Sequence, residues 1–186
     1  PGVDRHQVMV TDSERKEEHI REVSAFCQDI GCRNKVIRAV EGFMDEFLMN
    51  AIFDAPVDGQ GRPLYAGKNR TERVNLTDDQ AAVLSWACDG KRLGVAVEDP
   101  FGRLTARKVM EYLGRCFQKG DDQIEDKPGG AGLGLFKVYM ALDTFVVNLQ
   151  PGRRTEVVGL LDLRRRGKEG GGAVKSFHFF VSSDER

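Results

Sequence analysis

The sequence predicts an α+β fold in which helices pack on one face of a sheet. Two helical patterns occupy the first third of the 186 residues, strand patterns separated by turns dominate the C-terminal half, and no internal repeat is present. Helices followed by hairpin strands are typical of this class. We divide the chain into an N-terminal helical segment, residues 1–33, which packs on a single domain formed by residues 34–186.

Two helices are expected before residue 56. Thr11-Asp12-Ser13-Glu14 is a Thr-x-x-Glu capping box, which predicts a helix start there, and Gly31 is a natural stop. A second helix is predicted from Asn34 up to Pro56, because its apolar residues recur at i, i+3, i+4 and i+7. They are Val36, Ile37, Val40, Phe43, Met44, Phe47, Leu48, Ala51 and Ile52.

Irregular chain and then strands are expected after the second helix. Residues 57–75 are rich in Gly, Pro, Asp and Arg, which predicts a long surface loop. Strands at 83–88 and 93–97 flank Asp89-Gly90, a pair that favours a tight hairpin turn. Further helices are expected at 105–116 and 133–142, and further strands at 145–149, 155–163 and 174–181.

The composition excludes several classes of protein. Lys and Arg number 28 against 29 Asp and Glu, so binding of nucleic acid through bulk basicity is not expected. No apolar run approaches the ~18 residues of a membrane span. The four cysteines contain no Cys-x-x-Cys pair and the three histidines are scattered, so no zinc site is predicted. Reduced, mostly buried thiols in a cytoplasmic protein are expected.

Glu46 and Asn50 lie four residues apart on the second helix and project from the same side of it. Their positions fall on the shoulder of the apolar stripe, between core and solvent. An Asn oxygen is a hard ligand suited to Mg²⁺, and a carboxylate one turn earlier can accept a proton. Taken alone, the simpler interpretation is an exposed polar pair without function.

Asp99 ends a strand and directly precedes Pro100-Phe101-Gly102. A carboxylate there can accept a hydrogen bond from the exocyclic amine of adenine. A turn aspartate before a proline is an equally good description.

The glycine-rich segment 129–135 precedes an apolar helix. Three spaced glycines, Gly130, Gly132 and Gly134, allow backbone N–H groups to approach an anion at a helix start. The spacing differs from the dinucleotide fingerprint, and the Gly-Lys-Ser/Thr of a P-loop is absent.

Taken in order, these features resemble the GHKL superfamily of ATPases and kinases. Glu46-x-x-x-Asn50, Asp99, Gly130-x-Gly132-Leu133-Gly134 and Gly152-Arg153-Arg154-Thr155 are similar to its N, G1, G2 and G3 boxes, over roughly residues 34–163. The resemblance implies a two-layer α/β sandwich of the Bergerat type, with a mixed, mostly antiparallel sheet. It also implies that the chain binds ATP or ADP with Mg²⁺.

The resemblance also implies roles for individual residues. Asn50 would hold Mg²⁺, and Glu46 would be the general base. Asp99 would bind the adenine amine with support from Thr155, and residues 118–129 would form a lid. The nucleotide would be lined by Gly102, Gly130, Gly132, Leu133 and Gly134.

The chain looks most like the anti-sigma-factor type of serine kinase. This implies a regulatory kinase domain that transfers a γ-phosphoryl group to a protein partner, with a homodimer as one open arrangement. Two alternatives stay open: a non-catalytic signalling module, and a histidine-kinase catalytic domain separated from its acceptor. His19 lacks the acidic neighbour and the proline of a phospho-acceptor.

The chain departs from the family pattern at two places. Phe101 stands where the G1 box usually has glycine, where it could crowd the adenine pocket or stack beneath the base. Phe53 and Asp54 stand where the N box usually continues with a basic residue. An acid at that place repels a triphosphate unless a cation compensates, and Lys119, Lys127 and Lys137 are candidates.

Overall fold

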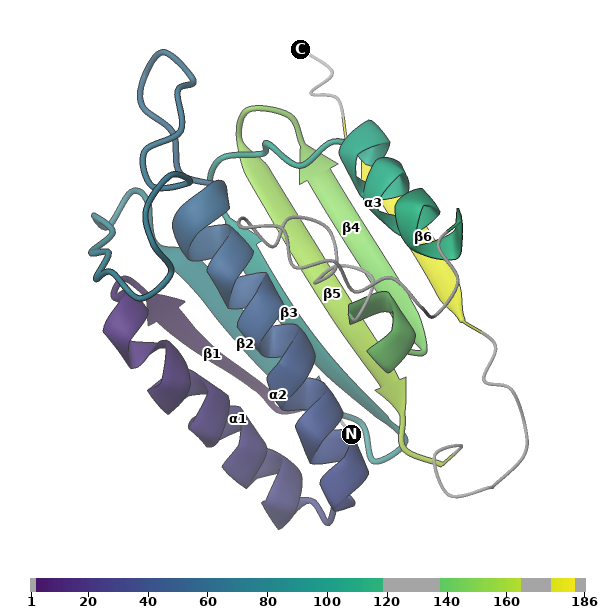
Figure 1. Ribbon diagram of the computed structural model, residues 1–186. Coiled ribbons are helices and arrows are strands. Elements are labelled where there is room, and N and C mark those ends of the chain that lie inside the picture. The colour runs from purple at the N-terminus through teal and green to yellow at the C-terminus, as the bar shows by residue number, and fades with distance from the viewer. Residues whose placement is uncertain (1–2, 119–137, 165–174, 183–186) are drawn as a thin grey trace.

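A six-stranded sheet forms the centre of the molecule. The computed structural model describes residues 3–118, 138–164 and 175–182, apart from the side chains of residues 112, 113 and 115–118. Within this part of the chain the strand order is β1-β2-β3-β5-β4-β6 (Figure 1). The strands are β1 (Arg5–Val10), β2 (Ala82–Cys88), β3 (Arg92–Asp99), β4 (Thr144–Gln150), β5 (Arg154–Asp162) and β6 (Ser176–Val181).

All neighbouring strands run antiparallel except β4 and β6, which are parallel. The predicted α+β class, with a mixed and mostly antiparallel sheet, is therefore confirmed. The strands expected at 83–88, 93–97, 145–149, 155–163 and 174–181 are all present, with small differences at their ends.

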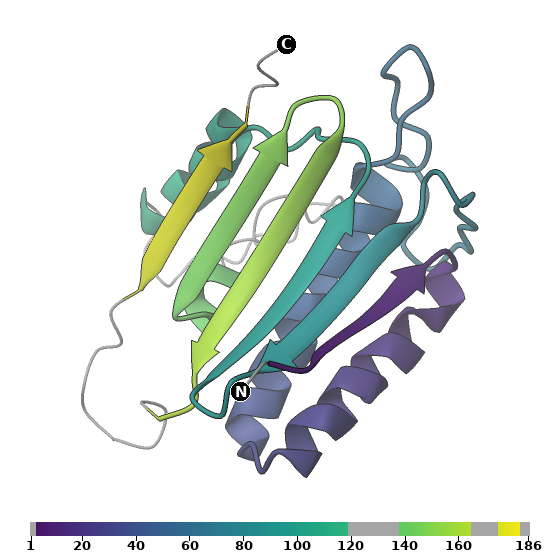
Figure 2. The same cartoon turned by 180° about the vertical axis from the view of Figure 1, so that it is seen from behind.

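The helices lie on one face of the sheet (Figure 1). They are α1 (Lys16–Asp29), α2 (Asn34–Met49) and α3 (Ala106–Gln118), and residues 138–141 are also helical. Seen from behind, the strands have no described helix in front of them (Figure 2). No helix in the described ranges is long and apolar enough to cross a membrane.

The start of the first helical segment differs from the prediction. Asp12, not Thr11, is the capping residue: its carboxylate accepts a hydrogen bond from the backbone N–H of Glu14 at 3.0 Å and begins the 3₁₀ turn η1 (Ser13–Arg15). Thr11 is instead held by the loop before β2, because its carbonyl accepts the N–H of Leu76 at 2.7 Å. At the other end, Gly31 has φ +77° and stops the helix as predicted.

α2 buries the apolar stripe that its periodicity predicts. Val36, Ile37, Val40, Phe43, Met44, Phe47 and Leu48 are all buried. The helix then widens into a π-helical turn, η2 (Asn50–Asp54), in which the N–H of Ala55 reaches the carbonyl of Asn50 at 2.9 Å. Such turns occur often at functional sites.

The sequence interpretation missed strand β1. Residues 5–10 pair antiparallel with β2 and form one edge of the sheet, whereas only helix was expected in the first 33 residues. The apolar alternation in this strand is short, with half-buried Val8 and buried Val10 on the helix side. Its partner strand begins only at Ala82, and no local pattern indicates a pairing across such a distance along the chain.

The segment 57–75 is irregular, as predicted. Asp58 organises its tip, because its carboxylate accepts the backbone N–H groups of Gln60 and Arg62 at 2.9 Å each. The predicted β2–β3 hairpin turns at Gly90, which has φ +81°. Of the cysteines, Cys27 is buried, Cys32 and Cys88 are half-buried, and all three are free thiols.

Candidate functional site

The predicted site residues that the structure describes lie at one end of the sheet. The C-terminal ends of α2 and β3 point to this end, where the segment that follows α2 begins (Figure 1). η2 contacts β3, and the first residues of β5 pair with the last residues of β3. Residues far apart in the sequence are thereby brought to one place.

Asp99 and Thr155 are direct partners across β3 and β5. Both side chains are buried, with 9% and 2% exposure respectively. One carboxylate oxygen of Asp99, Oδ1, accepts the backbone N–H of Phe101 at 2.9 Å. The Thr155 hydroxyl makes no hydrogen bond of normal geometry with any described residue.

Burial raises the pKa of Asp99 to about 6. The backbone N–H of Phe101, the nearby Thr155 hydroxyl and the backbone of Gly102 counteract this, in that order. A buried carboxylate beside an unpartnered hydroxyl leaves acceptor capacity for a further donor. The pair therefore fits a ligand that presents an N–H group.

Glu46 and Asn50 interact on the half-buried shoulder of α2. The Asn50 amide nitrogen donates to Glu46 Oε1 at 3.3 Å, and no described residue donates a hydrogen bond to the Asn50 side-chain oxygen. The pKa of Glu46 is raised, mainly by burial and further by the charges of Asp45 and Asp54, while Asn50 and Arg70 lower it. A carboxylate with a raised pKa is a stronger base.

Arg70, which sequence reasoning missed, lies beside Asp54 of η2, close to the end of α2 that carries Glu46. Its Nη2 donates to both carboxylate oxygens of Asp54 at 2.8 Å, and its guanidinium lies 5.0 Å from the ring centroid of Phe53. The uncompensated acid expected at residue 54 is therefore paired with a cation from the loop. The only signal in the sequence was an arginine-containing loop after Asp54, which did not single out residue 70.

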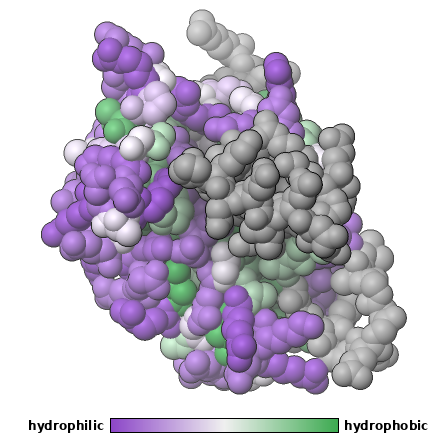
Figure 3. Space-filling model, in the orientation of Figure 1, coloured by the Kyte–Doolittle hydropathy of each residue, from purple (hydrophilic) through white to green (hydrophobic). Residues whose placement is uncertain are grey.

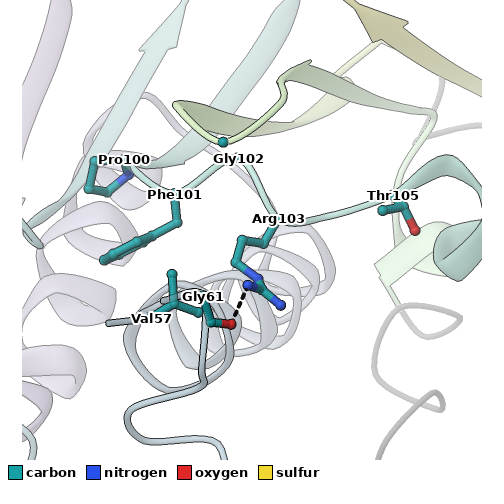
Figure 4. A pocket seen from close by; sticks show the side chains of 8 residues that line it. Val57, Gly61, Pro100, Phe101, Gly102, Arg103 and Thr105 are labelled. Atoms are coloured by element: carbon teal, nitrogen blue, oxygen red, sulfur yellow. Dashed lines mark hydrogen bonds between the residues drawn. The ribbon is translucent and has the colours of Figure 1, made fainter. Parts of the chain in front are cut away.

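An open cavity of about 490 Å³ lies at the turn that follows β3 (Figure 4). It is lined by Val57, Gly61, Pro100, Phe101, Gly102, Arg103, Thr105 and Gly152. Phe101 and Val57 face each other across it, and Arg103 donates to the Gly61 carbonyl at 2.6 Å (Figure 4). Phe101 thus forms part of the wall, with the loop after α2 opposite.

Gly102 lines this cavity and holds two loops together. It has φ +60°, and a Cβ atom there would lie 2.1 Å from the Gln150 carbonyl oxygen. Its own carbonyl accepts the N–H of Gly152 at 3.1 Å. Only glycine fits this close approach between the loop after β3 and the β4–β5 turn.

Other predicted features fall outside the described residues. These are Gly130, Gly132, Leu133 and Gly134, the lid beyond residue 118, Lys119, Lys127 and Lys137, and most of the helix predicted at 133–142. The described residues contain no cluster of three His, Cys, Asp or Glu side chains that could hold a metal. On the helix side, the described surface is mainly hydrophilic, including the loop after α2 (Figure 3).

No protein-family model matches this chain, and no curated protein is significantly similar to it.

Proposed function

We propose that this chain is an ATP- and Mg²⁺-binding regulatory kinase domain of the GHKL type, with the nucleotide bound at the sheet end that carries Asp99. The fold is proposed to be the two-layer Bergerat sandwich, and the γ-phosphoryl group to pass to a protein partner. The observation that carries the proposal is the buried pair of Asp99 and Thr155 with its unused acceptor capacity.

The Asp99–Thr155 pair supports adenine as the bound base. The ionised carboxylate accepts from the exocyclic amine, and the hydroxyl can contact the ring or a bridging water. Guanine would place a carbonyl oxygen against the same carboxylate, which is repulsive. The cavity at the turn directly after Asp99 has Phe101 in its wall, an aromatic ring on which a planar base could stack.

The end of α2 supports the phosphate chemistry. The Asn50 oxygen is a suitable Mg²⁺ ligand, and water and phosphate oxygens would complete the coordination. Bound Mg²⁺ would neutralise phosphate charge. Glu46, with its raised pKa, would accept the proton of the acceptor hydroxyl.

Calorimetric titration of Mg-ATP and Mg-ADP tests the binding site. Asp99→Asn keeps the size of the side chain and an acceptor for Phe101 but removes the charge, so we expect affinity to fall by about 10–100-fold. Glu98→Gln is the matched control, since Glu98 is the preceding residue and pairs with Arg154 on the opposite face of the sheet. Saturable binding that both variants retain equally would contradict the proposed role of Asp99.

Phosphoryl transfer tests the role of Glu46. Glu46→Gln should reduce transfer to a protein acceptor by about 10²-fold or more while sparing nucleotide affinity, because a general base acts on the acceptor and not on the nucleotide. Labelled ATP and candidate partners provide the assay. Acid-stable label would identify a hydroxyl acceptor, acid-labile label a histidine, and unchanged transfer in the variant would contradict the role.

A non-catalytic nucleotide-binding or partner-binding module is the second candidate. The altered G1 box and the acid at residue 54 favour it. Phe101 could crowd the base instead of stacking on it, and the carboxylates of Asp45, Glu46 and Asp54 repel a triphosphate. Nucleotide binding without transfer to any partner would support this candidate. The protein partner and the homodimer stay predictions.

A further inference from the structure

Arg70 links the long loop after α2 to the proposed phosphate end of the site. The residue lies 16 positions after Asp54, yet a single guanidinium nitrogen, Nη2, holds both oxygens of that carboxylate. The guanidinium also lies over the ring of Phe53, which is fully buried at the end of α2. Two contacts to adjacent residues of η2 therefore fix where this cation lies.

The guanidinium keeps donor capacity for a ligand. An arginine has five N–H groups in a planar fork, and in the described part of the chain the hydrogen bonds of Arg70 come from Nη2 alone. Its side chain is 40% exposed, so part of it is in contact with solvent. A planar fork of this kind matches the oxygens of a phosphate better than a lysine does.

The end of α2 carries several carboxylates, which would repel a phosphate group unless a cation lies beside them. Asp45, Glu46 and Asp54 all lie at the end of α2, and the first and last of these raise the pKa of Glu46 while Arg70 lowers it. Lys16 pairs with Asp45 on the side of α1. Arg70 pairs with Asp54, next to the helix turn that begins at Asn50. Without Arg70, Asp54 would repel a phosphate group held near Asn50.

We propose that Arg70 is a phosphate-positioning residue of the nucleotide site, with Asp54 and Phe53 holding its guanidinium so that its free N–H groups contact the β- or γ-phosphate. The inference rests on the proposed nucleotide-binding function. It assigns to the loop after α2 a part in ligand binding that its irregular sequence does not reveal.

Binding of three ligands that differ in phosphate content tests this role. Adenosine, ADP and ATP would be titrated with Mg²⁺ into the wild type, Arg70→Gln and Arg70→Lys. Arg70→Gln should weaken the binding of ADP and ATP by about 10–100-fold and leave the affinity for adenosine unchanged, because only the phosphates lose a charged partner. The affinity of Arg70→Lys for ADP and ATP should lie between those of the wild type and Arg70→Gln, since lysine keeps the charge but lacks the planar set of N–H donors.

Two controls separate this role from a merely structural one. Arg73→Gln removes a similar ion pair from the same loop, because Arg73 contacts Asp12 and Glu14 at the N-terminal turn. It should leave nucleotide binding unchanged. Asp54→Asn keeps a side-chain oxygen that can hold Arg70 and removes a repelling charge, so ATP affinity should be kept or increased. If Arg70 only anchored the loop, Asp54→Asn would weaken binding as Arg70→Gln does.

Three results would overturn the inference. Equal nucleotide affinity of Arg70→Gln and Arg73→Gln would show that Arg70 does not contact the ligand. An equal loss for adenosine and ATP in Arg70→Gln would show a general disturbance of the site. No binding of any nucleotide by the folded wild type would remove the proposed function itself, and the inference with it.

Discussion

In the proposed nucleotide site, protonation of the Asp99 carboxyl group should make nucleotide binding depend on pH. Its pKa is raised to about 6 in the free protein, mainly by burial. A ligand amine binds the ionised form, so binding competes with protonation of Asp99. We expect affinity for adenine nucleotides to be constant above pH 7 and to fall about tenfold per pH unit below pH 6, measured by calorimetry between pH 5 and 8.

Asp99→Asn supplies the comparison, because it has no proton to gain at this position. The affinity of this variant should lack the part of the pH dependence that Asp99 causes. The part caused by titration of the nucleotide phosphates remains in both proteins. The difference between the two profiles isolates the carboxyl group. Parallel profiles from pH 5 to 8 would show that Asp99 does not bind the base.

The residues of the site differ in how far the sequence could predict them. Asp99, Thr155, Glu46 and Asn50 stand in segments that resemble known motifs, and the strand register makes Asp99 and Thr155 direct partners. Arg70 belongs to no motif. Its position depends on how the loop folds back on η2, and loop geometry of this kind is not encoded in a periodic pattern.

At the scale of elements, the contact between the β3 end and the β4–β5 turn depends on Gly102. Gly102→Ala would place a methyl group 2.1 Å from the Gln150 carbonyl oxygen, at φ +60°. Backbone must move to accommodate it, so we expect a loss of about 2–4 kcal/mol in the free energy of unfolding. Urea denaturation of the wild type and the variant measures it.

Gly90→Ala is the matched control for this substitution. Gly90 has a similar φ of +81°, but a Cβ atom at this position would point into open space, with no neighbouring group within 4 Å. The substitution should therefore cost only the backbone strain, about 1–2 kcal/mol. Equal losses for the two variants would show that the close approach at Gly102 does not contribute to stability.

Elements with a strong local pattern were predictable and elements defined by distant partners were not. The apolar stripe of α2 and the Asp89-Gly90 hairpin are local signals, and both appear as expected. β1 is a short edge strand whose place depends on pairing with β2, so its own six residues do not specify it. The capping box failed at Thr11 for the same reason, since a distant loop binds its carbonyl.

For the molecule as a whole, two buried titratable groups should affect stability in opposite directions. His19 on α1 is 2% exposed, and burial is the main cause of its lowered pKa. The unfolded chain takes up a proton at this histidine near pH 6.5 and the folded chain resists it, so stability is lost as pH falls below 6.5. Asp99, with a raised pKa, instead favours the folded state as pH falls through about 6.

Unfolding free energies measured from pH 7.5 to 5 in two variants separate these effects. His19→Leu replaces an imidazole whose Nδ1 has no hydrogen-bond partner in the described residues, so it should remove the acid-dependent loss without weakening the fold at pH 7.5. Asp99→Asn removes the opposing contribution, so its stability should fall more steeply than that of the wild type below pH 6. If His19→Leu loses as much unfolding free energy between pH 7.5 and 5 as the wild type does, His19 is not the source of that loss. The burial of this histidine then has no measurable effect on how stability depends on pH.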